Sequence, residues 1–290
     1  MATDALATAP SSAPQARPPP AAGARRKPPL QELWQYRQLI GLLVVRELKV
    51  RYKRSVLGLL WTMLNPLLLM VVYTIVFTTV MPSAQPNFSI FLLSALLPWL
   101  FFQTSVLQGL HSILSNQDLI RKVRLPQAVF PLSVVGSNLV NFVLSLVPLL
   151  CLMIALGQPL TRAMLFLPLA ILIVCVFTSG LTLLFATFTV FFRDVKHLAE
   201  VLLQMLMYLS PVLYDLRQLG EHKAWWYPIF KTFLRLNPLS YLLPLVRDPV
   251  YYGRLPPLAT TSSAAGAALI SLLVGFAVFQ KLSPRHIHYL

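Results

Sequence analysis

Charged residues are missing from a long part of this 290-residue chain. Residues 55–117, which are 63 consecutive positions, contain no Asp, Glu, Lys or Arg, and only His111 among them titrates near neutrality. A water-exposed surface cannot be built from such a segment, because charged side chains normally lie on protein surfaces. A bilayer-spanning helix needs roughly 20 apolar residues, so the segment is long enough for two, divided by the Pro-containing turn at residues 81–87. We therefore expect a helical hairpin in a membrane.

The motifs of several enzyme classes are also absent. The chain has no Gly-x-x-x-x-Gly-Lys-Ser/Thr phosphate loop, no His-Glu-x-x-His, no Cys-x-x-Cys and no Gly-x-Ser-x-Gly. Its nine acidic residues and five histidines are scattered, so no metal site is expected. Cys151 and Cys175 lie in apolar runs and are expected to be buried free thiols. Nothing in the residues indicates that this chain is an enzyme or that it binds a cofactor itself.

The net charge is +15, although only 11% of the residues are charged. In a soluble protein this excess of Lys and Arg would indicate a nucleic-acid partner. Because 57% of the residues are hydrophobic, membrane topology and anionic lipid headgroups explain the charge better. We expect contacts with membrane lipids and no nucleic-acid partner.

Residues 1–30 differ from the rest of the chain. They are rich in Ala, Pro and Ser, and they lack the apolar core of about 7–15 residues that a signal peptide has. This composition predicts a disordered tail.

Further charge-free windows raise the expected number of spans to six. The predicted spans lie at about 57–81, 88–110, 129–156, 164–192, 198–219 and 259–281. With both termini on the cytoplasmic side, that side carries 17 Lys and Arg residues and the opposite side carries 7. The positive-inside rule therefore favours both termini in the cytoplasm. The fold class is predicted to be an all-α integral membrane protein.

Two further segments are expected to lie at the membrane surfaces. In residues 33–55, Val45, Leu48 and Tyr52 recur at helical spacing beside a block of basic residues, which predicts an amphipathic helix in the cytoplasmic interface. Residues 224–250 combine many aromatic residues with four prolines. They predict short re-entrant helices anchored at headgroup level before the last span.

The interiors of the predicted spans carry no ionisable groups of the kind that couple ions to transport; Glu200 and Asp215 lie near the two ends of the fifth span. The chain also has no repeated halves. A pore with neutral, aromatic walls needs an external energy source.

Several segments of the chain resemble a family of transporters that is driven by ATP. Residues 51–68, Arg-Tyr-Lys-Arg-Ser-Val-Leu-Gly-Leu-Leu-Trp-Thr-Met-Leu-Asn-Pro-Leu-Leu, resemble the start of the first span in type-2 ABC exporter permeases. The resemblance is strongest to permeases that export O-antigen, capsule-like polysaccharide or teichoic acid. It continues at residues 116–126, 192–195, 210–214 and 237–239, in the order the family has them.

The resemblance implies that residues 31–290 form an ABC type-2 transmembrane domain in a bacterial cytoplasmic membrane. It implies a homodimer with a channel between the protomers and two copies of a separate ATPase subunit, which binds ATP and Mg. It also implies a lipid-linked glycan as cargo, with O-antigen as the first expectation. Export of a drug or small lipid by the same fold, and an enzyme of envelope glycolipid synthesis, are the alternatives.

The resemblance also assigns roles to the charged segments. The first cytoplasmic loop is expected to be a coupling helix, although a solvated turn would have the same composition; Arg193-Asp194 is expected to dock the ATPase or to form a local cap. The expected ATPase-coupling residues are Asn116, Asp118, Arg121, Lys122, Arg124, Arg193 and Asp194. The expected interfacial-helix residues, which either anchor the helix or also dock the ATPase, are Arg46, Lys49, Arg51, Tyr52, Lys53 and Arg54.

Aromatic residues within the spans are the candidates for a channel wall. Tyr73 and Phe77 lie one helical turn apart on the first span, and Tyr208 and Tyr214 lie on the fifth. Rings can stack on sugars while offering few strong hydrogen bonds that would trap the cargo. The alternative is ordinary packing between helices.

Overall fold

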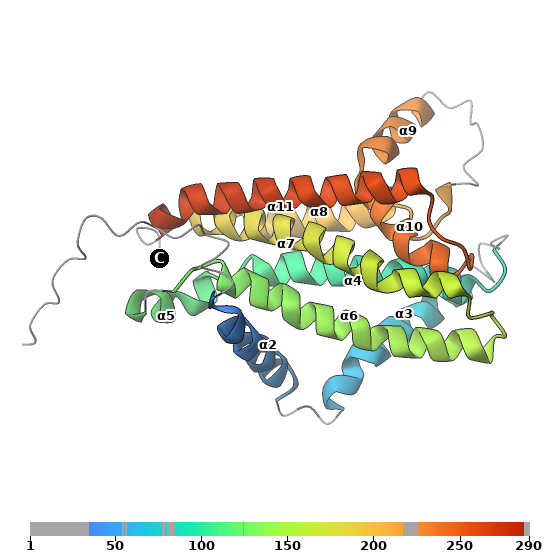
Figure 1. The fold of residues 1–290 in the computed structure, drawn as a ribbon, viewed down its shortest axis with the longest axis horizontal. Helices are drawn as coiled ribbons and strands as arrows, with labels where there is room; N and C mark the ends of the chain where they lie inside the picture. The colour runs from blue at the N-terminus through green and yellow to red at the C-terminus, as the bar shows by residue number, and fades with distance from the viewer. Residues whose placement is uncertain are drawn as a thin grey trace, which may run out of the picture.

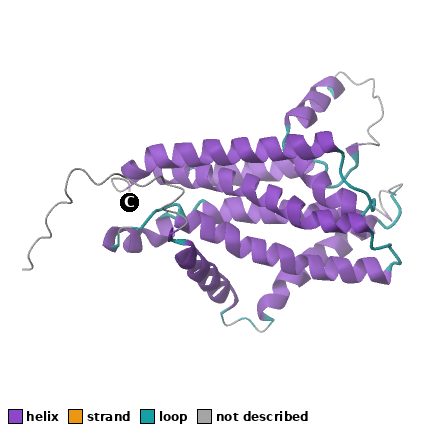
Figure 2. Ribbon diagram, viewed as in Figure 1, coloured by secondary structure: helices purple, strands orange, loops and turns teal. Residues whose placement is uncertain are grey.

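The computed structural model describes residues 35–53, 55, 57–76, 79, 85–123, 125–216 and 226–286. Every regular element in these ranges is a helix, which confirms the all-α class (Figure 2). The predicted tail at residues 1–30 lies outside the described residues.

Four described helices are long and apolar enough to cross a bilayer. They are α4 (Phe88–Gly109), α6 (Val129–Ala155), α7 (Leu167–Phe191), which follows a 3-10 helix at Arg162–Phe166, and α11 (Leu258–His286). The 22 residues of α4 extend about 33 Å at 1.5 Å per residue, which matches a hydrocarbon core of roughly 30 Å. The four helices lie along the long axis of the molecule (Figure 1). They correspond to the second, third, fourth and sixth predicted spans.

The helices of the first and fifth predicted spans are shorter. α3 (Trp61–Ile75) and α8 (Val195–Leu209) have 15 residues each, or about 22 Å, which is less than the hydrocarbon thickness. α8 ends ten residues before the predicted boundary, because Ser210 has an extended backbone and Pro211 follows it. Parts of both predicted spans, residues 77–78, 80–81 and 217–219, lie outside the described residues. A total of six spans therefore stays a prediction.

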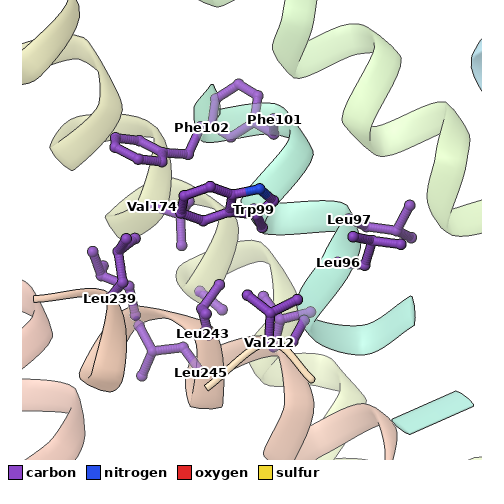
Figure 3. Packing of buried hydrophobic residues seen from close by; sticks show 14 of the residues in the cluster. Leu96, Leu97, Trp99, Phe101, Phe102, Val174, Val212, Leu239, Leu243 and Leu245 are labelled. Atoms are coloured by element: carbon purple, nitrogen blue, oxygen red, sulfur yellow. The ribbon is translucent and has the colours of Figure 1, made fainter. Parts of the chain in front are cut away.

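α4 forms the centre of the protein and α11 lies at its edge. The most apolar part of α4 is 78% buried, whereas that of α11 is 22% buried. α4 is apolar on all sides, as a helix enclosed by other helices should be. Trp99 on α4 contacts Phe102, which in turn contacts Phe177 on α7. Figure 3 shows side chains from α4, α7 and α10 (Leu239–Val250) meeting around Trp99.

α10 and α9 (Tyr227–Leu236) occupy most of the segment predicted to be re-entrant. Asn237 separates them: its Oδ1 accepts from the backbone N–H of Leu239 at 3.0 Å, and its Nδ2 donates to Ser210 Oγ at 2.9 Å. α10 is buried against α4, α7 and α11, while α9 projects from the bundle (Figure 1). The two short helices are confirmed, whereas their position in a membrane leaflet stays a prediction.

α2 (Arg37–Tyr52) occupies the predicted interfacial segment, of which residues 33, 34 and 54 lie outside the described residues. Its buried side differs from the predicted apolar face. Leu39, Ile40 and Leu43 pack against the start of α6, whereas Val45 is 47% exposed. Positions 43 and 45 are about 200° apart around a helix, so they face opposite directions. The exposed side's contact with a membrane surface stays a prediction.

Candidate functional site

A short helix at one end of the bundle, α5 (Gln117–Lys122), has an apolar side and a charged side. Leu119 and Ile120 pack against the start of α6. Asp118, Arg121 and Lys122 are exposed on the other side. α5 is therefore held to the bundle by apolar contacts while it presents charge outward.

The second predicted coupling segment lies at the same end. Arg193 and Asp194 are exposed between α7 and α8, at the end of the bundle where α5 follows α4 (Figure 1). Burial lowers the pKa of His111, in the loop after α4, and the charge of Lys196 lowers it further, against an opposite effect of Glu200. The start of α8 thus lies within electrostatic range of the loop between α4 and α5.

α2 is joined to this end through Arg46. Its Nη2 donates to Asn116 Oδ1 at 2.9 Å, and Asn116 Nδ2 donates to the backbone oxygen of Ser112 at 2.8 Å. Lys49 and Lys53 are exposed. The remaining predicted residues of this region, Arg54 and Arg124, lie outside the described residues.

Arg51 reaches into the bundle and is held by two amides. Its Nη1 donates to Asn138 Oδ1 at 2.9 Å, and its Nη2 donates to Gln108 Oε1 at 2.5 Å. Asn138 Nδ2 also donates to Gln108 Oε1, at 3.1 Å, and Tyr52 donates to Asn141 Oδ1 at 3.2 Å. No carboxylate among the described residues lies within ion-pair distance of Arg51. The end of α2 is thus fixed to α4 and α6 by neutral groups.

The sequence predicted that Arg51 and Tyr52 belong to the interfacial helix, but it did not predict their hydrogen-bond partners. Gln108, Asn138 and Asn141 are amide side chains within largely apolar segments, and Asn138 is buried; these amides were the available signal. A buried amide needs hydrogen-bond partners, so such positions indicate a contact with another polar group.

A pocket of about 340 Å³ opens beside Arg51. It lies between the end of α2, α3, α4 and α6. Its lining includes the polar residues Arg51, Tyr52, Asn138 and Asn141, and the apolar residues Leu97, Leu100 and Phe101 of α4.

Two of the four predicted channel residues lie within electrostatic range of each other. Tyr73 on α3 and Tyr208 on α8 are close enough to interact electrostatically, and Tyr208 is 59% exposed. Phe77 lies outside the described residues. Tyr214 is half-buried, with its ring 6.3 Å from that of Phe230 on α9. None of these contacts tests a channel, so the lining role stays a prediction.

A buried arginine at the other end of the bundle has a structural role that the sequence did not predict. Arg247 on α10 is 3% exposed and donates to three backbone carbonyls in the segment after α8: Pro211 at 2.8 Å, Val212 at 2.6 Å and Tyr214 at 3.2 Å. Its guanidinium carbon also lies 3.9 Å from the centre of the Phe91 ring. The carbonyls after a helix end have no helical partner, so Arg247 takes that place. In the sequence it was only one of the seven Lys and Arg residues assigned to the non-cytoplasmic side.

Among the described residues, no group of three or more His, Cys, Asp or Glu side chains could hold a metal ion. The expectation that both cysteines are buried was wrong for Cys151, which is exposed on α6. Its apolar surroundings in the sequence reflect the outer face of a long apolar helix, where exposed and buried positions are equally hydrophobic.

Comparisons with a protein-family model and with individual known proteins indicate the same family. The family described as ABC-2 type transporter matches residues 38–251. The chain is 41% identical over 252 residues to the O-antigen export system permease protein RfbA of Myxococcus xanthus, covering 87% of this chain and 95% of that protein.

More distant relatives carry related names. An O-antigen export system permease protein RfbA of Klebsiella pneumoniae is 31% identical over 251 residues, covering 85% of this chain and 94% of that protein. The polysialic acid transport protein KpsM of Escherichia coli is 24% identical over 247 residues, covering 83% and 92% respectively. With the family match over most of its length and four helices able to cross a membrane, this chain belongs to the ABC-2 type transporter family.

Proposed function

We propose that this chain is the membrane-spanning permease subunit of an ATP-driven exporter that moves a lipid-linked polysaccharide across the bacterial cytoplasmic membrane. O-antigen is the proposed polysaccharide. The observation that carries the proposal is the 41% identity to the Myxococcus xanthus O-antigen export permease across 95% of its length.

The energy comes from a separate ATPase subunit, two copies of which bind ATP and Mg. The support lies at one end of the bundle, where α5 turns Asp118, Arg121 and Lys122 outward and Arg193 and Asp194 are also exposed. These are charged groups on the end of an apolar body, as expected of a surface that receives a soluble partner. This chain contributes no catalytic residue.

Two copies of the chain enclose the transport path. The proposal is supported by α3 and α8, which both contact α4 and both leave apolar side chains exposed. Val72 on α3 and Met205 on α8 are each 57% exposed. A dimer that buries these faces brings Tyr73 and Tyr208 to its centre, beside a sliding sugar chain.

The proposed topology has six spans, with both termini in the cytoplasm and α9 and α10 at the outer leaflet. The support is the distribution of 17 Lys and Arg residues on one side and 7 on the other. In this orientation α5 and the end of α7 face the cytoplasm, where ATP is present.

The test is reconstitution of the full-length chain in proteoliposomes together with the proposed ATPase subunit. Addition of lipid-linked O-antigen is expected to stimulate ATP hydrolysis and to deliver glycan into the lumen. A lipid-linked glycan of unrelated structure and a transported drug serve as comparison substrates. Stimulation by the drug alone would contradict the proposal, as would release of a modified glycolipid without ATP, which would indicate an enzyme.

A further inference from the structure

The pocket beside Arg51 has the chemistry of an anion site. Because no carboxylate among the described residues pairs with Arg51, its positive charge is not neutralised by the protein. A cation near the hydrocarbon region is costly unless something compensates it. Gln108 and Asn138 orient the guanidinium but carry no charge.

Arginine matches one anion class particularly well. A guanidinium has five N–H donors in a planar fork, and the two amides accept from only two of its nitrogens. Phosphate oxygens accept from such a fork through two parallel hydrogen bonds. Tyr52, which donates to Asn141, lines the pocket beside Arg51. The polar part of the pocket is thus suited to a phosphate group.

The wall that α4 contributes is suited to a chain of carbon atoms, while Thr62, Asn65 and Ser145 add polar groups elsewhere in the lining. Leu97, Leu100 and Phe101 line the pocket over about one turn of α4, and Thr104 lies one turn nearer to Gln108. From residue 97 to residue 104 this wall extends about 10 Å along the helix. A free phosphate would leave the apolar wall exposed to water, whereas an amphipathic molecule would cover both parts.

We propose that this pocket binds the phosphate group of an anionic lipid, with Arg51 contacting the phosphate and the apolar wall of α4 contacting the start of the lipid chain. Two sources share this chemistry: the headgroup of a membrane phospholipid and the diphosphate of a lipid-linked glycan. Binding of a phospholipid is independent of the proposed export function, and only the second source rests on it.

The experiment measures lipid binding to the full-length chain in detergent by native mass spectrometry. Dioleoylphosphatidylglycerol is the first probe and geranylgeranyl diphosphate the second. Arg51→Gln is expected to weaken binding of both probes at least tenfold. Thr104→Trp, which fills the pocket while Arg51 stays in place, should have a similar effect. Arg285→Gln is the matched control, because it removes the same charge from an exposed position on α11.

The outcomes separate a lipid site from a purely structural arginine. If either folded pocket variant binds both probes as tightly as the unmodified chain does, the proposal is wrong. Should both variants fail to fold, a phosphatidylglycerol with a photoreactive diazirine in its acyl chain is used on the unmodified chain. Labelling of α3, α4 or α6 at the pocket supports the site, and labelling confined to other surfaces overturns it.

Competition between the probes identifies the source. If geranylgeranyl diphosphate displaces phosphatidylglycerol and inorganic diphosphate does not, the site prefers a lipid diphosphate and requires the chain. If phosphatidylglycerol resists displacement, the occupant is a structural phospholipid. Both results support the site. Neither depends on ATP hydrolysis or export, so failure of the proposed function would be seen separately.

Discussion

Gly275 on α11 lies directly against the backbone of Gly180 on α7. A Cβ atom at position 275 would be 2.7 Å from the carbonyl carbon of Gly180, closer than real Cβ contacts occur. Beside this contact, Ser271 Oγ donates to the backbone oxygen of Phe177 at 2.9 Å. Small residues that allow two backbones to approach, together with a polar side chain between them, are characteristic of helix pairs in membranes.

Gly275→Ala is therefore expected to separate α7 from α11. The added methyl group meets backbone atoms, which cannot move as a side chain can, and the cost should be about 1–3 kcal/mol of unfolding free energy. Thermal unfolding in detergent would show it as a lower midpoint. Gly266→Ala is the matched control, because nothing lies within 4 Å of a Cβ at that position on the same helix. Equal midpoints for the two variants would contradict the close contact.

Arg247→Met should loosen the segment after α8. The variant keeps an apolar stem, but it leaves the carbonyls of Pro211, Val212 and Tyr214 without this donor, at about 1–3 kcal/mol for each buried group that stays unsatisfied. We expect a lower unfolding midpoint and faster proteolysis between α8 and α9. Arg235→Met, at an exposed position on α9, should change neither measurement. Similar behaviour of the two variants would show that Arg247 contributes nothing special.

Charge reversal on α5 should uncouple ATP hydrolysis from export. Arg121→Glu combined with Lys122→Glu changes two exposed side chains, so stability should change by only about 0.5 kcal/mol or less. Glycan export should decrease relative to ATP hydrolysis by the assembled complex, and co-purification of the ATPase shows how much complex forms. The same double change at Lys281 and Arg285, exposed near the end of α11, tests for a general charge effect. Normal export by the α5 variant would remove this helix from the coupling path.

Changing Tyr73 and Tyr208 to Ala tests the proposed channel wall. If the rings line the path, export per folded dimer should slow, or the closed pore should leak, while the dimer and ATPase docking stay intact. If the rings only pack against other helices, removing them should instead lower the yield of folded protein, with the half-buried Tyr73 contributing more than the exposed Tyr208. Reduced folding with unchanged export per dimer would assign both residues to packing.

Cysteine labelling in intact cells tests the orientation. After Cys151 and Cys175 are replaced by Ser, single cysteines at Gln117 and Lys196 are expected to be protected from an impermeant thiol reagent. One at Leu160, exposed between α6 and α7, should react. Permeabilised cells provide the control that all three sites are reactive when reached. Labelling of Gln117 or Lys196 from outside would overturn the proposed topology.

The positions of the long helices follow from the sequence alone. The spans expected at 88–110 and 129–156 agree closely with Phe88–Gly109 and Val129–Ala155. The reason is physical: the bilayer sets the length of an apolar helix, and the backbone bonds of a helix are made within the segment itself. The charged side of α5 could likewise be predicted from the sequence, because the residues that form it lie close together along the chain.

Which helix occupies the centre was decided by the tertiary structure. α4 and α11 are similarly apolar, yet α4 is surrounded by other helices and α11 lies at the edge. Lipid and protein interior are both apolar, so hydropathy does not distinguish a helix that faces one from a helix that faces the other. The close fit of Gly275 to Gly180 decides instead which surfaces of α7 and α11 meet.

The polar contacts between helices could not be predicted without the tertiary structure. Arg51 meets Gln108 and Asn138 across 57 and 87 positions of the chain, and Arg247 meets Val212 across 35. Sequence shows that such groups are present in apolar surroundings and need partners. Only the packing of α2 on α6, and of α10 beside the end of α8, brings each arginine to its acceptors. The sequence by itself therefore determined the apolar helices and the charged end of the bundle. The tertiary structure decided which groups hold Arg51 and the buried Arg247, and where a pocket remains, because those contacts join segments that no local pattern relates.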